Sequence, residues 1–225
     1  MTDYKITAKE HRANARKTLG GNIFSSNWLM SLVVLLIYTA IVGAISFISS
    51  LIGAFIPFLS FAPSLIGILI SGPLLFGMAS YFLALSRSNS AKVETLFDGF
   101  STDFATNFLI GLMTYLFTFL WSLLLFIPGI IKGYAYSMAY YIKHDNPTYN
   151  WKQCLDESQR IMKGKKWKLF CLDISFIGWI IVGAFACGVG TFWVEPYMQA
   201  ARASFYESII EKPTEENFDV YTEAV

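Results

Sequence analysis

Two ionisable residues in the last third of the chain, Asp173 and Arg202, have the types that form an ion pair. They lie in apolar segments near 169–190 and 195–210. If these segments form an antiparallel helical hairpin, the two residues lie within about one turn of the same depth. A lone arginine at the centre of a membrane costs about 2.5–3.5 kcal/mol. The spacing predicts a buried ion pair; the alternative is that each side chain reaches the headgroups separately. Lys132 and Glu195 are expected near the outer boundary.

A second group of charged residues has the composition of a site for anionic lipid headgroups. Five of the nine residues from 160 to 168 are basic and none is acidic. Basic residues beside a membrane surface each contribute about 1 kcal/mol to the attraction for anionic lipid. The plainer and preferred interpretation is that these charges only set the topology. The candidate patch consists of Arg160, Lys163, Lys165, Lys166 and Lys168.

Residues that could carry covalent or metal chemistry are few. The two histidines, His11 and His144, have no neighbouring ligand set, and Cys154, Cys171 and Cys187 have no local histidine to activate a thiol. No phosphate-binding loop or hydrolase motif is present in the sequence. We therefore predict a protein that is not an enzyme and that uses no cofactor and no metal.

The composition indicates where these residues are held. Hydrophobic residues make up 55% of the 225 residues and charged residues only 15%, whereas a soluble domain carries about 25% charged residues. A formal net charge of +1 argues against a nucleic-acid partner. The chain is therefore expected to be an all-α, polytopic membrane helix bundle.

The positions of the charges define the expected spans, since no Asp, Glu, Lys, Arg or His occurs between Lys17 and Arg87. A span needs roughly 20 apolar residues. We expect one transmembrane domain over 1–210 and an acidic, disordered tail over 211–225. Prolines at the start of the descending segments 72–86, 128–142 and 195–209 suggest three Pro-led hairpins. The six expected spans lie near 28–52, 64–86, 104–127, 129–142, 169–190 and 195–210.

Three amphipathic helices are expected on the cytoplasmic side, at 5–20, 91–103 and 150–164. Capping-box pairs support the first and the last, at Thr7 with Glu10 and at Asn150 with Gln153. Because lysine and arginine gather in these segments, both termini are predicted to be cytoplasmic. Trp28 and Trp167 then mark the inner boundary, and Trp193 marks the outer one.

Short motifs spread over nearly the whole chain carry a resemblance to known proteins, and these are Ala15-Arg16, Leu19, Asp145-Asn146-Pro147, Ser158, Met162-Lys163-Gly164, Phe170, Ser175-Phe176, Gly178-Trp179, Pro196-Tyr197 and Phe205-Tyr206. With these motifs the chain resembles a family of uncharacterised bacterial integral membrane proteins, defined only as a domain of unknown function. A more distant likeness links the chain to the noncatalytic membrane domains attached to glycerophosphodiester phosphodiesterases. The resemblance implies a six-helix protein of the bacterial cell membrane and supplies no site residues.

Two classes of function stay open. In the first, the protein is a nonenzymatic scaffold, regulatory partner or lipid-handling protein, whose partners are anionic lipids on the cytoplasmic side or another membrane protein. In the second, it is a transporter or flippase that moves a small solute or an amphiphile through a cavity in the bundle. A transporter is expected to have several ionisable groups at mid-depth, and their scarcity favours the first class.

Overall fold

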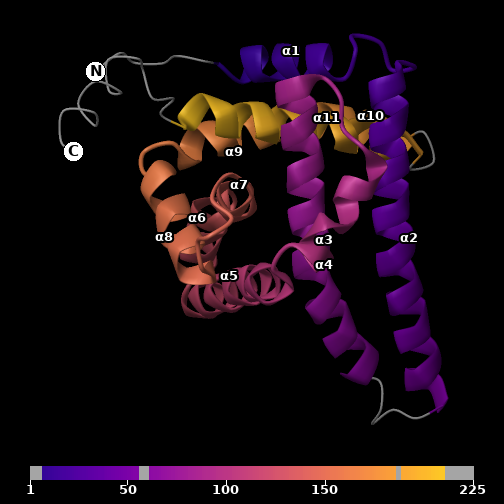
Figure 1. Cartoon of the computed structure of the whole chain (residues 1–225), viewed down its shortest axis with the longest axis vertical. Helices are drawn as coiled ribbons and strands as arrows, with labels where there is room; N and C mark the ends of the chain where they lie inside the picture. The colour runs from indigo at the N-terminus through magenta and orange to yellow at the C-terminus, as the bar shows by residue number, and fades with distance from the viewer. Residues whose placement is uncertain (1–6, 56–60, 186–188, 211–225) are drawn as a thin grey trace.

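The computed structural model describes residues 7–55, 61–185 and 189–210, and every regular element within these ranges is helical (Figure 1). The predicted all-α class is confirmed for this part of the chain. Three stretches are long and apolar enough to cross a membrane, namely Ser26–Ile52, Gly67–Ser88 and Phe104–Leu124. The predicted tail over 211–225 lies outside the described residues.

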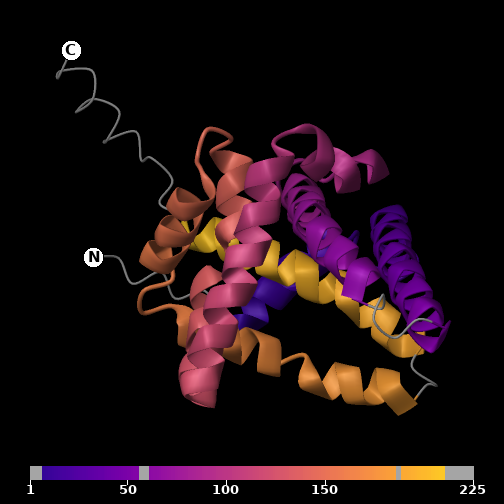
Figure 2. The same cartoon turned by 90° about the horizontal axis from the view of Figure 1, so that it is seen from below.

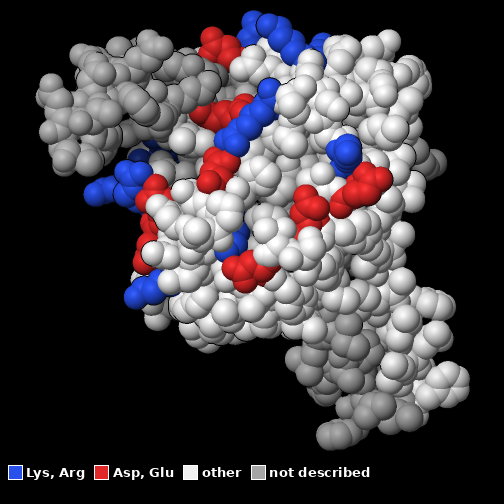
Figure 3. Space-filling model, in the orientation of Figure 1, with Lys and Arg blue, Asp and Glu red and all other residues white. Residues whose placement is uncertain are grey.

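A long hairpin of α2 (Ser26–Phe55) and α3 (Phe61–Ser88) runs along the longest axis of the molecule (Figure 1). Apolar residues of α2 point outward, and Leu36, Phe47 and Phe55 are 63%, 65% and 84% exposed. Exposed apolar area on this scale is unfavourable in water and favourable in hydrocarbon. The hairpin has no charged residue before Arg87. The charged side chains visible in Figure 3 lie in the upper part of the molecule, and the visible face of the lower part of the hairpin has none. This distribution is typical of a membrane-embedded helix pair.

The other half of α3 forms the centre of the core. From Leu74 to Leu85 it is buried almost throughout, against α11 (Val189–Ile209), α7 (Ala139–Asp145) and α2. The 3-10 helix η2 (Val93–Phe97) and the short α4 (Asp98–Ser101) follow α3 and pack back onto it. They occupy the segment 91–103 that was predicted as one amphipathic helix.

Helix α5 (Phe104–Leu124) crosses α3 instead of running beside it, as the two views show (Figures 1 and 2). Glycines allow the close approach: a Cβ built on Gly72 would lie 2.6 Å from the Asn107 carbonyl oxygen, and one on Gly111 would lie 3.1 Å from Gly72 Cα. Small residues at helix crossings in membranes permit such contacts.

The structure divides two of the three later spans predicted from the sequence into shorter helices. The segment 129–142 is divided into α6 (Phe126–Tyr136) and α7. The segment 169–190 is divided into α9 (Lys166–Ile174) and α10 (Ile177–Phe185), where the Ser175 hydroxyl donates to the Leu172 carbonyl at 2.6 Å. Helices α10 and α11 form a hairpin that lies crosswise to α2 and α3 (Figures 1 and 2).

The prediction of three Pro-led helices is correct only for α6, where Pro128 is the third residue. Pro73 and Pro196 lie inside α3 and α11. Both helices begin several residues before the proline. Trp193 therefore lies within α11 and not in a turn that precedes it.

The first and the last of the three predicted amphipathic segments form helices with the expected caps. In α1 (Ala8–Thr18), the Glu10 carboxylate accepts a hydrogen bond from the Thr7 backbone N–H at 2.6 Å. In α8 (Trp151–Ile161), Asn150 and Gln153 bond reciprocally at 2.9 Å. Helix α1 packs on α11 through His11, whose Nδ1 lies 3.4 Å from Ser204 Oγ and whose ring meets the edge of Phe205.

The buried His11 predicts a pH dependence of stability. Burial, opposed by Glu10 and reinforced by Lys168, lowers the pKa of His11 from 6.5 to about 4. Below pH 6.5 the unfolded chain takes up a proton that the folded chain does not, so stability is expected to fall as the pH falls from about 6.5 to about 4. His11→Gln is expected to flatten this part of the profile. An unchanged slope of the unfolding free energy against pH in the variant would contradict the assignment.

Candidate functional site

Asp173 and Arg202 lie side by side, on α9 and α11. Arg202 Nε is 3.2 Å from Asp173 Oδ1, and Nη2 is 3.0 Å from Oδ2, so the guanidinium holds the carboxylate with two hydrogen bonds. The Arg202 side chain is 37% exposed and the Asp173 side chain 15%. The pair predicted from the hairpin geometry is thus present as a contact, but it is half-buried where full burial was predicted.

Tyr134 completes this cluster. The Tyr134 hydroxyl of α6 donates to Asp173 Oδ2 at 3.0 Å. The three side chains face a groove of about 350 Å³ between α5, α6, α9 and α11. Its other lining residues are mostly small, and these are Thr118, Ser122, Gly129, Ile130, Gly133, Ser137 and Leu169. The groove offers a guanidinium, a carboxylate and a phenol, which can bind polar groups.

The ion pair predicts coupling between two distant positions. Asp173→Ala and Arg202→Ala are each expected to lower the free energy of unfolding by about 1–2 kcal/mol, since partial exposure weakens the pair relative to a fully buried one. The double variant should recover part of the summed loss, because neither charge is then left alone. Thermal unfolding in detergent measures the cycle, and strictly additive losses would contradict the coupling.

The two residues expected near the outer boundary, Lys132 and Glu195, contact different partners in the structure. Lys132 Nζ donates to Gln159 Oε1 of α8 at 2.9 Å and lies 5.3 Å from the centre of the Trp121 ring. Helix α8 was predicted to be cytoplasmic. If it is, its contact with Lys132 places that residue away from the outer boundary. Glu195 accepts a bond from Gln199 on its own helix at 2.9 Å.

The predicted tryptophan anchors also change place. Trp28 and Trp193 were assigned to opposite boundaries, yet both line one cavity, and the Trp28 ring is 5.9 Å from that of Tyr197, one turn after Trp193. The assignment to opposite boundaries assumes that α11 spans, whereas in the structure α11 packs against α2 beside Trp28. Trp167 is 70% exposed on α9.

The candidate lipid patch at 160–168 is partly neutralised within the chain. Arg160 forms two hydrogen bonds to Glu157, at 2.7 and 2.8 Å. Lys165 Nζ donates to the Ile209 carbonyl at 3.3 Å. Lys163 and Lys168 are exposed, while Lys166 is half-buried. This arrangement ties the patch to α8 and α11 as well as presenting charge.

A second polar cluster, missed from the sequence, joins the ends of α3, α7 and α11. Arg87 binds Asp145 through two hydrogen bonds of 2.6 and 2.8 Å and lies 3.3 Å from Glu207. The Tyr206 hydroxyl donates to Asp145 at 2.9 Å. Burial acts to raise the pKa of Asp145, but the bonds from Arg87 and Tyr206 lower it below its ordinary value. Asp145 and Tyr206 belong to the motifs quoted above, which was the available signal.

Two groups with potential for covalent chemistry, Ser80 and Cys154, are buried. Ser80 Oγ is 2.9 Å from His144 Nδ1, a distance typical of a nucleophile and its base. Ser80 is only 1% exposed, so a substrate has no access to its hydroxyl. Burial raises the pKa of the Cys154 thiol to about 11, which keeps it protonated. Within the described ranges, His, Cys, Asp and Glu form no group of three that could hold a metal ion.

Comparison with known proteins gives one match. The family described as "Protein of unknown function (DUF975)" matches residues 1–132 and 123–213. No curated protein and no solved structure matches the chain.

Proposed function

We propose that this chain, which belongs to the DUF975 family of proteins of unknown function, is a nonenzymatic integral membrane protein that handles lipid or acts as a scaffold. The observation that carries the proposal is the contrast between its two halves. Exposed apolar side chains cover α2 and α5, while lysine and arginine gather on α1 and around α8. Such a protein contacts hydrocarbon with one part and anionic headgroups with the other.

The proposed location is the bacterial cell membrane, with both termini cytoplasmic. Six crossings remain the sequence-based prediction. The crosswise α10–α11 hairpin favours a smaller number of full crossings, with α11 near the same boundary as α1.

Cysteine labelling from outside intact cells tests this topology. On a cysteine-free background, Phe55→Cys at the hairpin tip is expected to react and Lys163→Cys to stay protected. Phe192→Cys distinguishes the arrangements, since it reacts if α11 spans and stays protected if α11 lies at the inner boundary. Labelling of Lys163→Cys would overturn the proposed orientation.

Mass spectrometry after mild detergent extraction tests the function. Copurified anionic lipid supports lipid handling, and a stoichiometric protein partner supports a scaffold. Retention of a water-soluble solute would instead favour a transporter that uses the groove beside Asp173 and Arg202. Extraction of the protein with neither lipid nor a partner would overturn the proposal.

A further inference from the structure

A cavity lies between α1, α10, α11 and the start of α2, and the functional argument above does not use it. Its volume is about 820 Å³, within the range of about 300–1,000 Å³ typical of small-molecule sites. Cations line one side of it and aromatic side chains line the rest. None of the described residues that line it is acidic.

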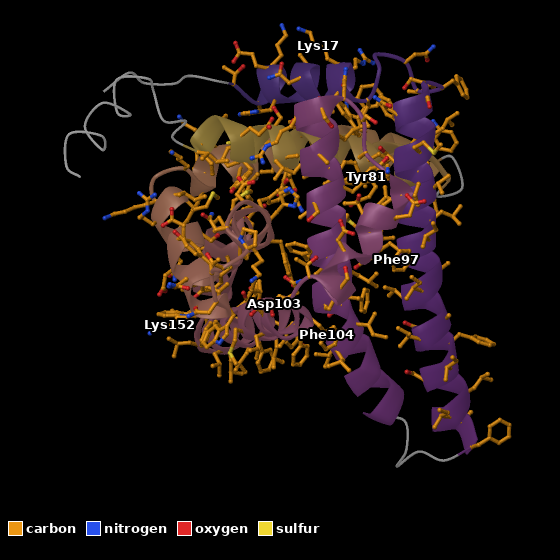
Figure 4. The ribbon with its side chains drawn as sticks, in the orientation of Figure 1. Lys17, Tyr81, Phe97, Asp103, Phe104 and Lys152 are labelled. Carbon is orange, nitrogen blue, oxygen red and sulfur yellow. The ribbon has the colours of Figure 1, made fainter. Side chains whose placement is uncertain are left out.

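The cations come from one face of α1. Lys9, Arg12, Arg16 and Lys17 follow helical spacing, so they lie on the same side of the helix. The neighbouring face is fixed by His11, which is 3% exposed against α11. Arg12 Nη1 also donates to the Ser175 carbonyl at 3.3 Å, at the break between α9 and α10. These contacts hold the basic face over the cavity, at the charged end of the molecule, where Lys17 lies (Figure 4).

The aromatic side is built by Trp28, Trp179, Trp193 and Tyr197, from three different helices. Trp28 is 4% exposed, and its indole N–H has no acceptor within the described part of the chain. A buried indole N–H usually has a partner. The cavity therefore combines positive charge with apolar aromatic walls.

We propose that this cavity binds one acidic phospholipid, with its phosphate at the basic face of α1 and its glycerol and upper chains between the tryptophans. The inference rests on the proposed function, because it requires a membrane to supply the lipid. Arginine and lysine recognise phosphate oxygens through charge-assisted hydrogen bonds. Tryptophan is favoured at the level where headgroups meet chains.

The test measures binding of phosphatidylglycerol to the full chain in neutral detergent, by native mass spectrometry, with phosphatidylcholine for comparison. Lys9→Gln/Arg16→Gln is expected to weaken phosphatidylglycerol binding about 25-fold, at roughly fivefold for each basic residue. The matched control, Lys92→Gln/Lys152→Gln, removes the same charge at two exposed residues outside the cavity and outside the 160–168 patch, and is expected to change binding less than twofold. Equal losses in the two variants, or no loss in the first, would overturn the site.

Two further measurements separate the alternatives. Phosphatidylglycerol with brominated chains should quench tryptophan fluorescence, less so in Trp193→Phe than in the control Trp151→Phe. Equal quenching in the two variants would overturn the placement of the chains.

Glycerol phosphate, the headgroup without chains, should not displace the lipid, and displacement at equal concentration would show a phosphate site instead. If the unmodified chain fails to prefer phosphatidylglycerol, lipid handling itself fails, whereas a preference unaffected by Lys9→Gln/Arg16→Gln removes only this site.

Discussion

Gly77→Ala is expected to prevent the close packing of η2 on α3 and to lower the free energy of unfolding by about 3 kcal/mol or more. A Cβ at position 77 would lie 1.8 Å from the Leu96 carbonyl oxygen, 2.4 Å from its carbonyl carbon and 2.8 Å from its Cα. These are backbone atoms, which cannot rotate away. The whole segment that follows α3 would have to shift, and with it the start of α5.

Gly43→Ala is the matched control, since it places the same methyl group on another apolar helix. A Cβ at Gly43 meets nothing within 4 Å, and alanine is the better helix former by about 1 kcal/mol. The control is therefore expected to be neutral or stabilising. Thermal unfolding in detergent compares the two variants, and similar midpoints would show that the η2–α3 contact is not tight.

Lys143→Met is the second change with a large expected effect. Lys143 is 1% exposed, and its ammonium uses all three donors, on Asp103 Oδ2 and the Pro147 carbonyl at 2.8 Å and on the Tyr149 carbonyl at 2.9 Å. Methionine keeps the length of the side chain but leaves these three acceptors without the cation. We expect a loss of about 3 kcal/mol, the lower end for breaking a buried pair, because Asp103 is 41% exposed.

Lys143→Met is also expected to raise the pKa of Asp103. The bond from Lys143 is the main reason that the pKa of Asp103 lies below its ordinary value. Asp103 stands at the start of α5, next to Phe104, and accepts a bond from the Thr106 backbone N–H at 3.2 Å (Figure 4). Lys152→Met, on the outer face of α8, is the control and should leave stability within about 0.5 kcal/mol. Equal effects of the two variants would contradict the role of Lys143.

The sequence was sufficient for features that depend on local pattern. Helical spacing and the capping boxes located α1 and α8, and the absence of charge between Lys17 and Arg87 located α2 and α3. The contact between Asp173 and Arg202 was predicted because two antiparallel helices joined by a short turn place residues level whatever direction the hairpin takes. That argument holds equally for a hairpin that spans the membrane and for one that lies across α2.

Features that depend on distant partners were not predictable from the sequence. Nothing near Lys143 indicates that its acceptor, Asp103, lies 40 residues earlier. Trp193 was assigned to the outer boundary on the assumption that α11 spans, but it lines the same cavity as Trp28. The direction of a helix is not encoded in its hydropathy. Likewise, Pro73 and Pro196 indicated helix starts, but tertiary packing continues both helices past them.

The contact between α1 and α11 has a consequence for the order of synthesis. His11 is made early, and Ser204, which it touches, is 193 residues further along the chain. At about 5–20 residues per second, the partner of α1 emerges roughly 10–40 seconds after α1 itself. Throughout that interval the first helix has no α11 to pack on, and its basic face is free to rest on the membrane surface. A nascent chain that stops before α11 therefore differs from a finished one at its opposite end, where a protease or chaperone can detect an undocked helix.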